Sequence, residues 1–80
     1  MEIMTIVGIR RIDFTDDSGK RINGYSIYYT MDAEGVIGQA AGKIYLSAEK
    51  ASGMTLPNPG DKVEVMYDRY GKPVKFTVVG

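Results

Sequence analysis

Residues 24–31 decide the fold, and they run Gly24-Tyr25-Ser26-Ile27-Tyr28-Tyr29-Thr30-Met31. Large side chains occupy every odd position, namely Tyr25, Ile27, Tyr29 and Met31. Successive side chains of a β-strand point to opposite faces of the sheet, so this alternation predicts a strand whose odd positions lie in the core. Tyr28 stands at an even position and is therefore expected to face water.

Strands are predicted on both sides of this stretch. The first covers residues 3–14, where the apolar positions change parity between Ile9 and Ile12. A strand that keeps one face buried can change parity only through an extra residue, so we expect a bulge near residues 8–11. Further strands are expected at residues 43–47, 62–68 and 74–79. In these strands Tyr45 faces water, and the core faces also receive Phe14, Tyr67 and Phe76.

Turns and one short helix connect the predicted strands. Residues 15–20 and 70–73 have the composition of hairpin loops. Ser47 is placed to cap one or two helical turns, which Gly53 ends. Five strands without a long helix bury their apolar side chains best as a small barrel. We therefore predict an all-β fold in one domain, residues 1–80. It is a five-stranded barrel of OB-fold type, with an SH3-like barrel as the alternative and at most one short helix between the third and fourth strands.

The composition excludes several functional classes. The 80 residues contain no cysteine and no histidine, so disulfides, thiolate metal sites and histidine-based catalysis are absent. The adjacent carboxylates of Asp16 and Asp17 are too few ligands for a divalent cation. The glycines Gly35, Gly38 and Gly42 precede no long helix that could bind a dinucleotide. We therefore expect a protein that is not an enzyme and uses neither a metal nor a cofactor.

The charge and the apolar pattern bear on location. Ten basic residues balance ten acidic residues, so the net charge is zero and does not indicate any class of binding partner. No apolar run approaches the length of a membrane span, and the first residues lack the pattern of a signal peptide. We expect a cytoplasmic protein without membrane contact.

Aromatic and basic residues coincide outside the predicted core. The tyrosines expected at the surface are Tyr28, Tyr45 and Tyr70. The cations in or beside the strands and turns that carry them are Arg10, Arg11, Arg21, Lys43 and Lys72. Proteins that bind single-stranded nucleic acid stack bases on exposed rings, for about 1–3 kcal/mol per base, and hold the backbone with cations. These residues are therefore the predicted nucleic-acid site.

Each ring also has a structural explanation, because tyrosine is common in strands with its hydroxyl group at the surface. A protein-interaction module is the rival function, since small barrels bind peptides through exposed aromatics and free strand edges. Cations around Tyr28 and Tyr45 would favour nucleic acid. An apolar patch around Met31, Met54 or Val79 would favour a protein partner.

Three features of the chain resemble known proteins. One is the long first strand with its adjacent arginines, and the other two are sequence segments. They are Gly24-Tyr25-Ser26-Ile27-Tyr28-Tyr29 and Pro59-Gly60-Asp61-Lys62-Val63-Glu64-Val65-Met66-Tyr67-Asp68-Arg69-Tyr70-Gly71-Lys72. In this layout the chain resembles small OB-fold proteins of bacterial phages and integrative mobile elements. It resembles, more distantly, the gene V type single-stranded DNA-binding proteins of filamentous phages, which are OB-like barrels that work as dimers. The resemblance implies an OB-like barrel that binds single-stranded DNA.

The predicted function is sequence-tolerant binding of single-stranded DNA in a phage or mobile-element setting. The sequence leaves open whether RNA is bound as well and whether the chain forms a homodimer. The alternative function is that of a protein-interaction adaptor in a replication or conjugation complex.

Overall fold

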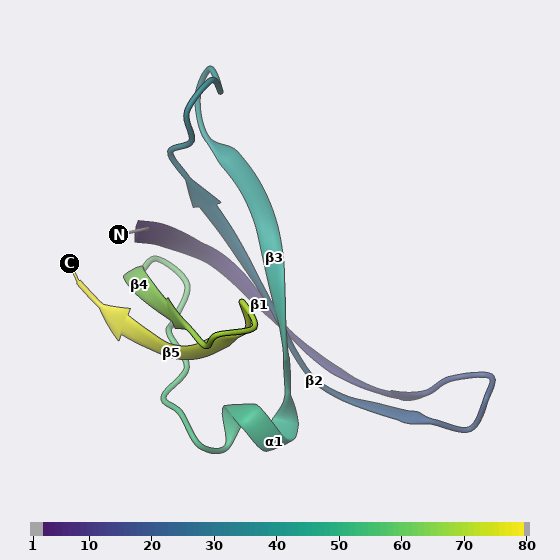
Figure 1. The fold of residues 1–80 in the computed structure, drawn as a ribbon. Helices are drawn as coiled ribbons and strands as arrows, with labels where there is room; N and C mark the ends of the chain where they lie inside the picture. Colours follow the sequence, from purple (N-terminus) through teal and green to yellow (C-terminus); the bar gives the residue numbers. More distant parts are fainter. Residues whose placement is uncertain (1–2, 80) are drawn as a thin grey trace.

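Five strands form one antiparallel sheet in the computed structural model, which describes residues 3–79 (Figure 1). The strands are β1 (Ile3–Thr15), β2 (Arg21–Met31), β3 (Ala40–Ser47), β4 (Lys62–Tyr67) and β5 (Pro73–Val78). The helix α1 (Ala48–Ala51) follows β3 directly, and Ser47 caps it as predicted, its Oγ accepting a hydrogen bond from the N–H of Lys50 at 3.2 Å. The prediction of an all-β chain with one short helix between the third and fourth strands is confirmed. Nowhere between residues 3 and 79 is there a helix with the length and apolar character needed to cross a membrane.

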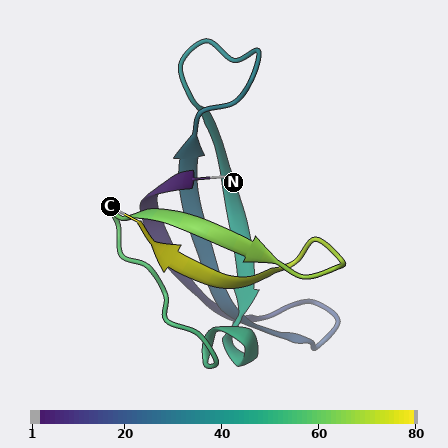
Figure 2. The ribbon, with the colours of Figure 1, turned by 60° about the vertical axis from the view of Figure 1, so that its left-hand side comes forward.

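Backbone pairing orders the strands β3-β2-β1-β4-β5. The central strand, β1, pairs with β2 over most of its length but with β4 only through residues 3–5. Because this second pairing is short, the β4–β5 hairpin diverges from the long strands and folds over one side of them (Figures 1 and 2). Within the described residues β3 and β5 form no ladder, so the sheet keeps two free edges. The barrel expected from the sequence is therefore present as a curled five-stranded sheet that is not closed.

A bulge in β1 decides which of its side chains face the core. The register with β2 shifts between Ile6 and Gly8, so Ile6 and Ile9 both point inward despite their different parity. The shift lies just before the predicted window of residues 8–11, and no second shift follows it. From Ile9 onward the side chains simply alternate, which turns Phe14 outward.

The core lies between the long strands and the β4–β5 hairpin. Its buried side chains are Met4, Ile6, Ile27, Leu46, Val63, Val65 and Phe76. The hydrophobic side chains packed against them include Tyr29, Met31 and Ile44, all three on the face that the alternation predicted.

Two aromatic residues predicted to be core residues are instead exposed. Phe14 is 54% exposed, because the bulge turns it outward in a part of the β1–β2 hairpin that projects beyond the core (Figure 1). Tyr67 is 42% exposed, at a register shift that follows Met66 at the end of β4. Tyr25 lies in the same projecting hairpin and is half-buried.

The β1–β2 and β4–β5 turns have the same construction. They span residues 16–20, Asp-Asp-Ser-Gly-Lys, and residues 68–72, Asp-Arg-Tyr-Gly-Lys. In both turns the aspartate N–H donates to the lysine carbonyl at 2.8 Å, and the glycine N–H donates to the aspartate carbonyl at 3.0 Å. The glycines adopt φ angles of 85° and 76°, which side chains of other residues rarely allow. Each turn therefore ends with a lysine in an equivalent position.

The aspartate carboxylates hold these turns together. Oδ1 of Asp16 accepts hydrogen bonds from the Ser18 hydroxyl at 2.7 Å and from the Lys20 N–H at 2.9 Å. Oδ1 of Asp68 accepts from the N–H of the tyrosine and of the lysine in its turn, at 2.8 and 3.0 Å. These bonds favour the charged form. The hydrogen bond from the Ser18 hydroxyl is the main cause that lowers the pKa of Asp16, and the Lys72 N–H is the main cause for Asp68.

We predict that acidification weakens the fold through these two carboxylates. A carboxyl group whose pKa is lowered by folding contributes stability above its unfolded-state pKa, and this contribution is lost as the pH falls through the folded-state pKa. The thermal unfolding midpoint should therefore drop between about pH 5 and pH 2. In the double variant Asp16→Asn, Asp68→Asn, which keeps the acceptor oxygens but cannot titrate, the drop should be smaller. An unchanged pH dependence in this variant would contradict the prediction.

A second prediction concerns the core. Replacing Ile27, which is completely buried, by alanine should lower the free energy of unfolding by about 2–5 kcal/mol, because the lost side chain leaves a cavity. The matched control is Ile37→Ala, at a position that is 104% exposed, where the change should stay within about 0.5 kcal/mol. Urea unfolding followed by circular dichroism measures both. Equal losses in the two variants would show that the core is placed wrongly.

Candidate nucleic-acid interface

The predicted site residues Arg10, Tyr28, Lys43 and Tyr45 lie on one face of the sheet. Ser26 of β2 pairs with Arg10 of β1 on one side and with Tyr45 of β3 on the other, and Tyr28 pairs with Lys43. Directly paired residues of antiparallel strands place their side chains on the same face. This face is opposite the core side of β1, β2 and β3, and we call it the outer face.

The ring of Tyr45 lies across the backbone of β2. A Cβ atom on Gly24 would sit only 2.6 Å from the Tyr45 Oη and 2.8 Å from its Cζ, so the ring occupies the space above this glycine. The Tyr45 hydroxyl donates a hydrogen bond to the carbonyl oxygen of Asn23 at 3.2 Å. Tyr45 is nevertheless 47% exposed. One side of the ring therefore rests on the strand while the other side meets water.

Tyr28 is held in a similar way against β1. Its Cδ2 lies 3.8 Å from where a Cβ on Gly8 would be, an ordinary packing contact, and the side chain is half-buried. Between the Tyr28 and Tyr45 positions lies Ser26, which is 4% exposed. Two rings of the outer face, those of Tyr28 and Tyr45, thus each lie against a glycine of a neighbouring strand, with a serine between them.

The charge of the outer face differs from that of the whole chain. Its positions on β1, β2 and β3 follow from the register. They are Thr5, Gly8, Arg10, Ile12, Phe14, Ile22, Gly24, Ser26, Tyr28, Thr30, Ala41, Lys43, Tyr45 and Ser47. The two charged side chains of this set, Arg10 and Lys43, are basic and exposed. The outer face of these three strands is therefore positive, although the net charge of the chain is zero.

Two grooves meet at Tyr45. One, of about 350 Å³, runs between the end of β3 and the beginning of β5 and is bordered by Lys50 and Lys72. The other, of about 410 Å³, runs toward the β1–β2 turn and is bordered by Lys20, by the predicted site residue Arg21 and by Glu49. The lysines that end the two equivalent turns therefore lie on either side of Tyr45, and one carboxylate borders the second groove.

Arg11 and Arg21 lie on the opposite face and have partners within the chain. The Arg11 guanidinium carbon is 5.1 Å from the centre of the Tyr25 ring, and its Nη1 donates to the Gly24 carbonyl at 2.9 Å. Arg21 pairs with Asp13 through two bonds of 3.0 Å. The hydrogen bond from Arg21 lowers the pKa of Asp13, and the same bond raises the pKa of Arg21. Neither arginine joins Arg10 on the outer face.

Tyr70 lies apart from the other two rings, in the β4–β5 turn, where it is 76% exposed. The guanidinium carbon of Arg69 is 5.8 Å from the centre of its ring. Of the residues predicted in this turn, Lys72 is the one that reaches the Tyr45 groove.

Three residues of this interface were not predicted from the sequence, namely Lys20, Gly24 and Lys50. The repeated Asp-x-x-Gly-Lys pattern of the two turns was a usable signal for Lys20, because it marks an equivalent of Lys72. The role of Gly24 had no such signal, since it depends on the register between β2 and β3, which brings the Tyr45 ring over this glycine.

No group of three or more histidine, cysteine, aspartate or glutamate side chains that could hold a metal ion is found between residues 3 and 79. No family model, curated protein or solved structure matches the chain.

Proposed function

We propose that the chain binds single-stranded DNA on the outer face, with little preference for sequence. One observation carries the proposal: the rings of Tyr28 and Tyr45 lean on glycines of neighbouring strands on a face whose charged side chains are basic. A stacking platform needs a flat ring with a free side, and a phosphate backbone needs nearby cations.

Stacking on these rings requires little reordering. The Tyr45 ring is fixed below by Gly24 and at its tip by the hydrogen bond to Asn23. A ring already fixed in its bound orientation loses less side-chain entropy when a base stacks on it. Every base has an aromatic face, so this contact accepts any sequence.

The phosphate contacts come from the cations around the rings. Arg10 and Lys43 flank Tyr28 and Tyr45 on the outer face, while Lys72 and Lys20 border the grooves on either side of Tyr45. In this proposal the bound DNA strand runs from the β1–β2 turn across Tyr45 to the β4–β5 turn. Few phosphates are neutralised along it, so the affinity should depend on salt only moderately.

An OB-type barrel is part of the same proposal. Such barrels bind oligonucleotides on the face of the second and third strands, between the loops that join strands one to two and four to five. The order β3-β2-β1-β4-β5 and the helix between β3 and β4 fit this architecture. The groove that Leu46 and Ser47 share with Lys72 and Pro73 brings the beginning of β5 near the end of β3, where such a barrel would close.

A protein-interaction role is the second candidate. It rests on a different observation, a cavity at the base of the β2–β3 loop that is lined partly by Met31 and Val79.

We predict that the rings of the outer face dominate affinity. Tyr45→Leu and Tyr28→Leu should each weaken the binding of labelled oligo-dT about tenfold, because each removes one stacking platform. Tyr45→Phe keeps the ring and should bind almost like the wild type. Tyr25→Leu is the control on the opposite face. Fluorescence anisotropy measures the dissociation constants, and circular dichroism checks the fold. Equal weakening by Tyr25→Leu would contradict the assignment of the face.

The salt dependence tests the cations separately. With about two to four phosphates contacted, the logarithm of the binding constant should fall with the logarithm of salt concentration with a slope of about −1.5 to −3. Lys43→Ala should reduce this slope by about 0.7, since one phosphate contact is lost. Lys75→Ala, on β5, should leave it unchanged. Absence of oligo-dT binding at low salt would refute the proposed function.

A further inference from the structure

The outer face continues along the β1–β2 hairpin to a further ring, that of Phe14. Phe14 of β1 pairs directly with Ile22 of β2, so both side chains lie on this face. The next pair on the same face is Ile12 with Gly24, the glycine that the Tyr45 ring covers. Successive pairs on one face are two residues apart, or about 7 Å. Phe14 therefore stands one such step beyond the glycine under the Tyr45 ring.

The fold leaves much of Phe14 in contact with water. Among the described residues, Phe14 belongs neither to the buried core nor to the hydrophobic side chains packed against it, and it is 54% exposed. β3 ends at Ser47, opposite Gly24, so no third strand lies beside Phe14 and Ile22 in the described part of the chain. Figure 1 shows the two-stranded hairpin projecting at this point. Pairing with Ile22 stabilises the hairpin but leaves the Phe14 ring accessible to a ligand.

Basic side chains lie on both sides of this ring. On the β1 side, Arg10 and Arg11 line a cavity of about 440 Å³ that Phe14 borders. On the β2 side, Lys20 and Arg21 line the groove of about 410 Å³ described above. A phosphate backbone that crosses the hairpin at this ring therefore meets cations on either side.

Carboxylates are fewer around this ring. Asp13 lines the cavity beside Phe14, but it is paired with Arg21 through two bonds of 3.0 Å. Glu49 lines the groove on the β2 side. The two linings together contain twice as many basic as acidic side chains, which favours a polyanion. Asp17, which is exposed in the β1–β2 turn, marks the limit of this basic surface.

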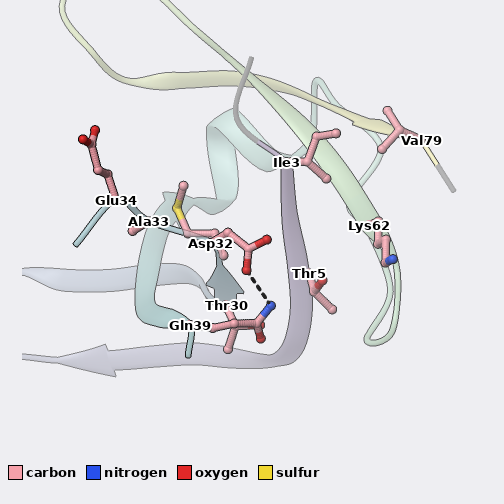
Figure 3. A pocket seen from close by; sticks show the side chains of 10 residues that line it. Ile3, Thr5, Thr30, Asp32, Ala33, Glu34, Gln39, Lys62 and Val79 are labelled. Atoms are coloured by element: carbon pink, nitrogen blue, oxygen red, sulfur yellow. Dashed lines mark hydrogen bonds between the residues drawn. The ribbon is translucent and has the colours of Figure 1, made fainter. Parts of the chain in front are cut away.

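At its other end the outer face meets a more acidic cavity. Thr5 and Thr30 of the outer face line a cavity of about 850 Å³ at the base of the β2–β3 loop. Its charged lining consists of Asp32, Glu34 and Lys62, and Figure 3 shows the two carboxylates on one side and the lysine on the other. Two carboxylates against one lysine disfavour phosphate. A bound strand is therefore directed toward the β1–β2 hairpin rather than toward this cavity.

We propose that Phe14 is a third stacking platform and that the single-stranded DNA site extends along the β1–β2 hairpin to this ring. The inference rests on the proposed function of the outer face and lengthens its site. Phe14 stacks a base of the same strand that Tyr45 holds, and Arg10 and Lys20 contact the phosphates beside it. Bases in a stacked strand are about 3.4 Å apart, so a step of about 7 Å along the face corresponds to about two bases.

The affinity for labelled oligo-dT, measured by fluorescence anisotropy, tests the role of the ring. Phe14→Leu keeps an apolar side chain beside Ile22 but removes the ring, so it should raise the dissociation constant about tenfold. Phe14→Tyr keeps the ring and should bind within about twofold of the wild type. Tyr25→Leu, on the opposite face of the same hairpin, is the matched control and should change the affinity little. Circular dichroism checks that each variant is folded.

The outcomes separate this inference from the proposed function. Weakened binding in Tyr45→Leu together with wild-type affinity in Phe14→Leu would overturn the third platform and leave the proposed function standing. Equal weakening by Phe14→Leu and Phe14→Tyr would also overturn the third platform, because the second variant keeps the ring. A wild type that does not bind oligo-dT at low salt overturns both.

Tryptophan fluorescence tests the contact directly, because the chain has no tryptophan of its own. The emission of Phe14→Trp should be quenched by saturating oligo-dT, since a base stacks on the indole ring, and high salt should restore it. Ile37→Trp, at the 104% exposed tip of the β2–β3 loop, is the matched control and should keep its emission. Unchanged emission of Phe14→Trp, or equal quenching of both variants, would overturn the inference.

Discussion

The bulge in β1 is the constraint on which both faces of the sheet depend. β1 pairs with β4 near its beginning and with β2 over most of its length. Its core-facing residues have even numbers up to Ile6 and odd numbers from Ile9 onward. The register shift after Ile6 produces this change by turning Ile9 inward. The same shift places Gly8 and Arg10 on the outer face beside Tyr28. Without the extra residue either Ile6 or Ile9 would lose its place in the core, and Arg10 would leave the row that it shares with Tyr45.

Packing against glycine explains why the tyrosine rings lie flat on the sheet, and it is compatible with a role in binding. On the core side, the Oη of Tyr29 would lie 2.7 Å from a Cβ on Gly42, so this pair is structural. Tyr45 makes the equivalent contact with Gly24 on the outer face, where no further layer covers the ring. The structural contact uses the lower side of the Tyr45 ring and leaves the upper side free. A single residue can therefore stabilise the sheet and serve as a platform.

Local patterns predicted much of this molecule, and pairing between distant residues decided the rest. The alternation in residues 24–31 placed Ile27 in the core and Tyr28 away from it, because the period of a strand is fixed by its backbone. The prediction failed for Phe14, because the bulge lies before Ile9 and no register shift separates Ile9 from Phe14, so the two side chains point to opposite faces. Neither Arg21 nor Gly24 could be assigned from the sequence, since the ion pair of one and the close contact of the other depend on neighbouring strands.

The distribution of carboxylates explains how a chain with no net charge presents a basic surface. Asp16 and Asp68 direct their carboxylates at backbone N–H groups of their own turns, and Asp13 pairs with Arg21 on the opposite face. Asp61 accepts a hydrogen bond from the N–H of Asn58 in its own loop. These acidic residues shape turns and a hairpin away from the outer face, whereas Arg10 and the lysines near Tyr45 keep their charges at the surface. Net charge is a sum over the whole chain, but a bound strand responds to the charges within about one Debye length, roughly 8–10 Å at physiological salt.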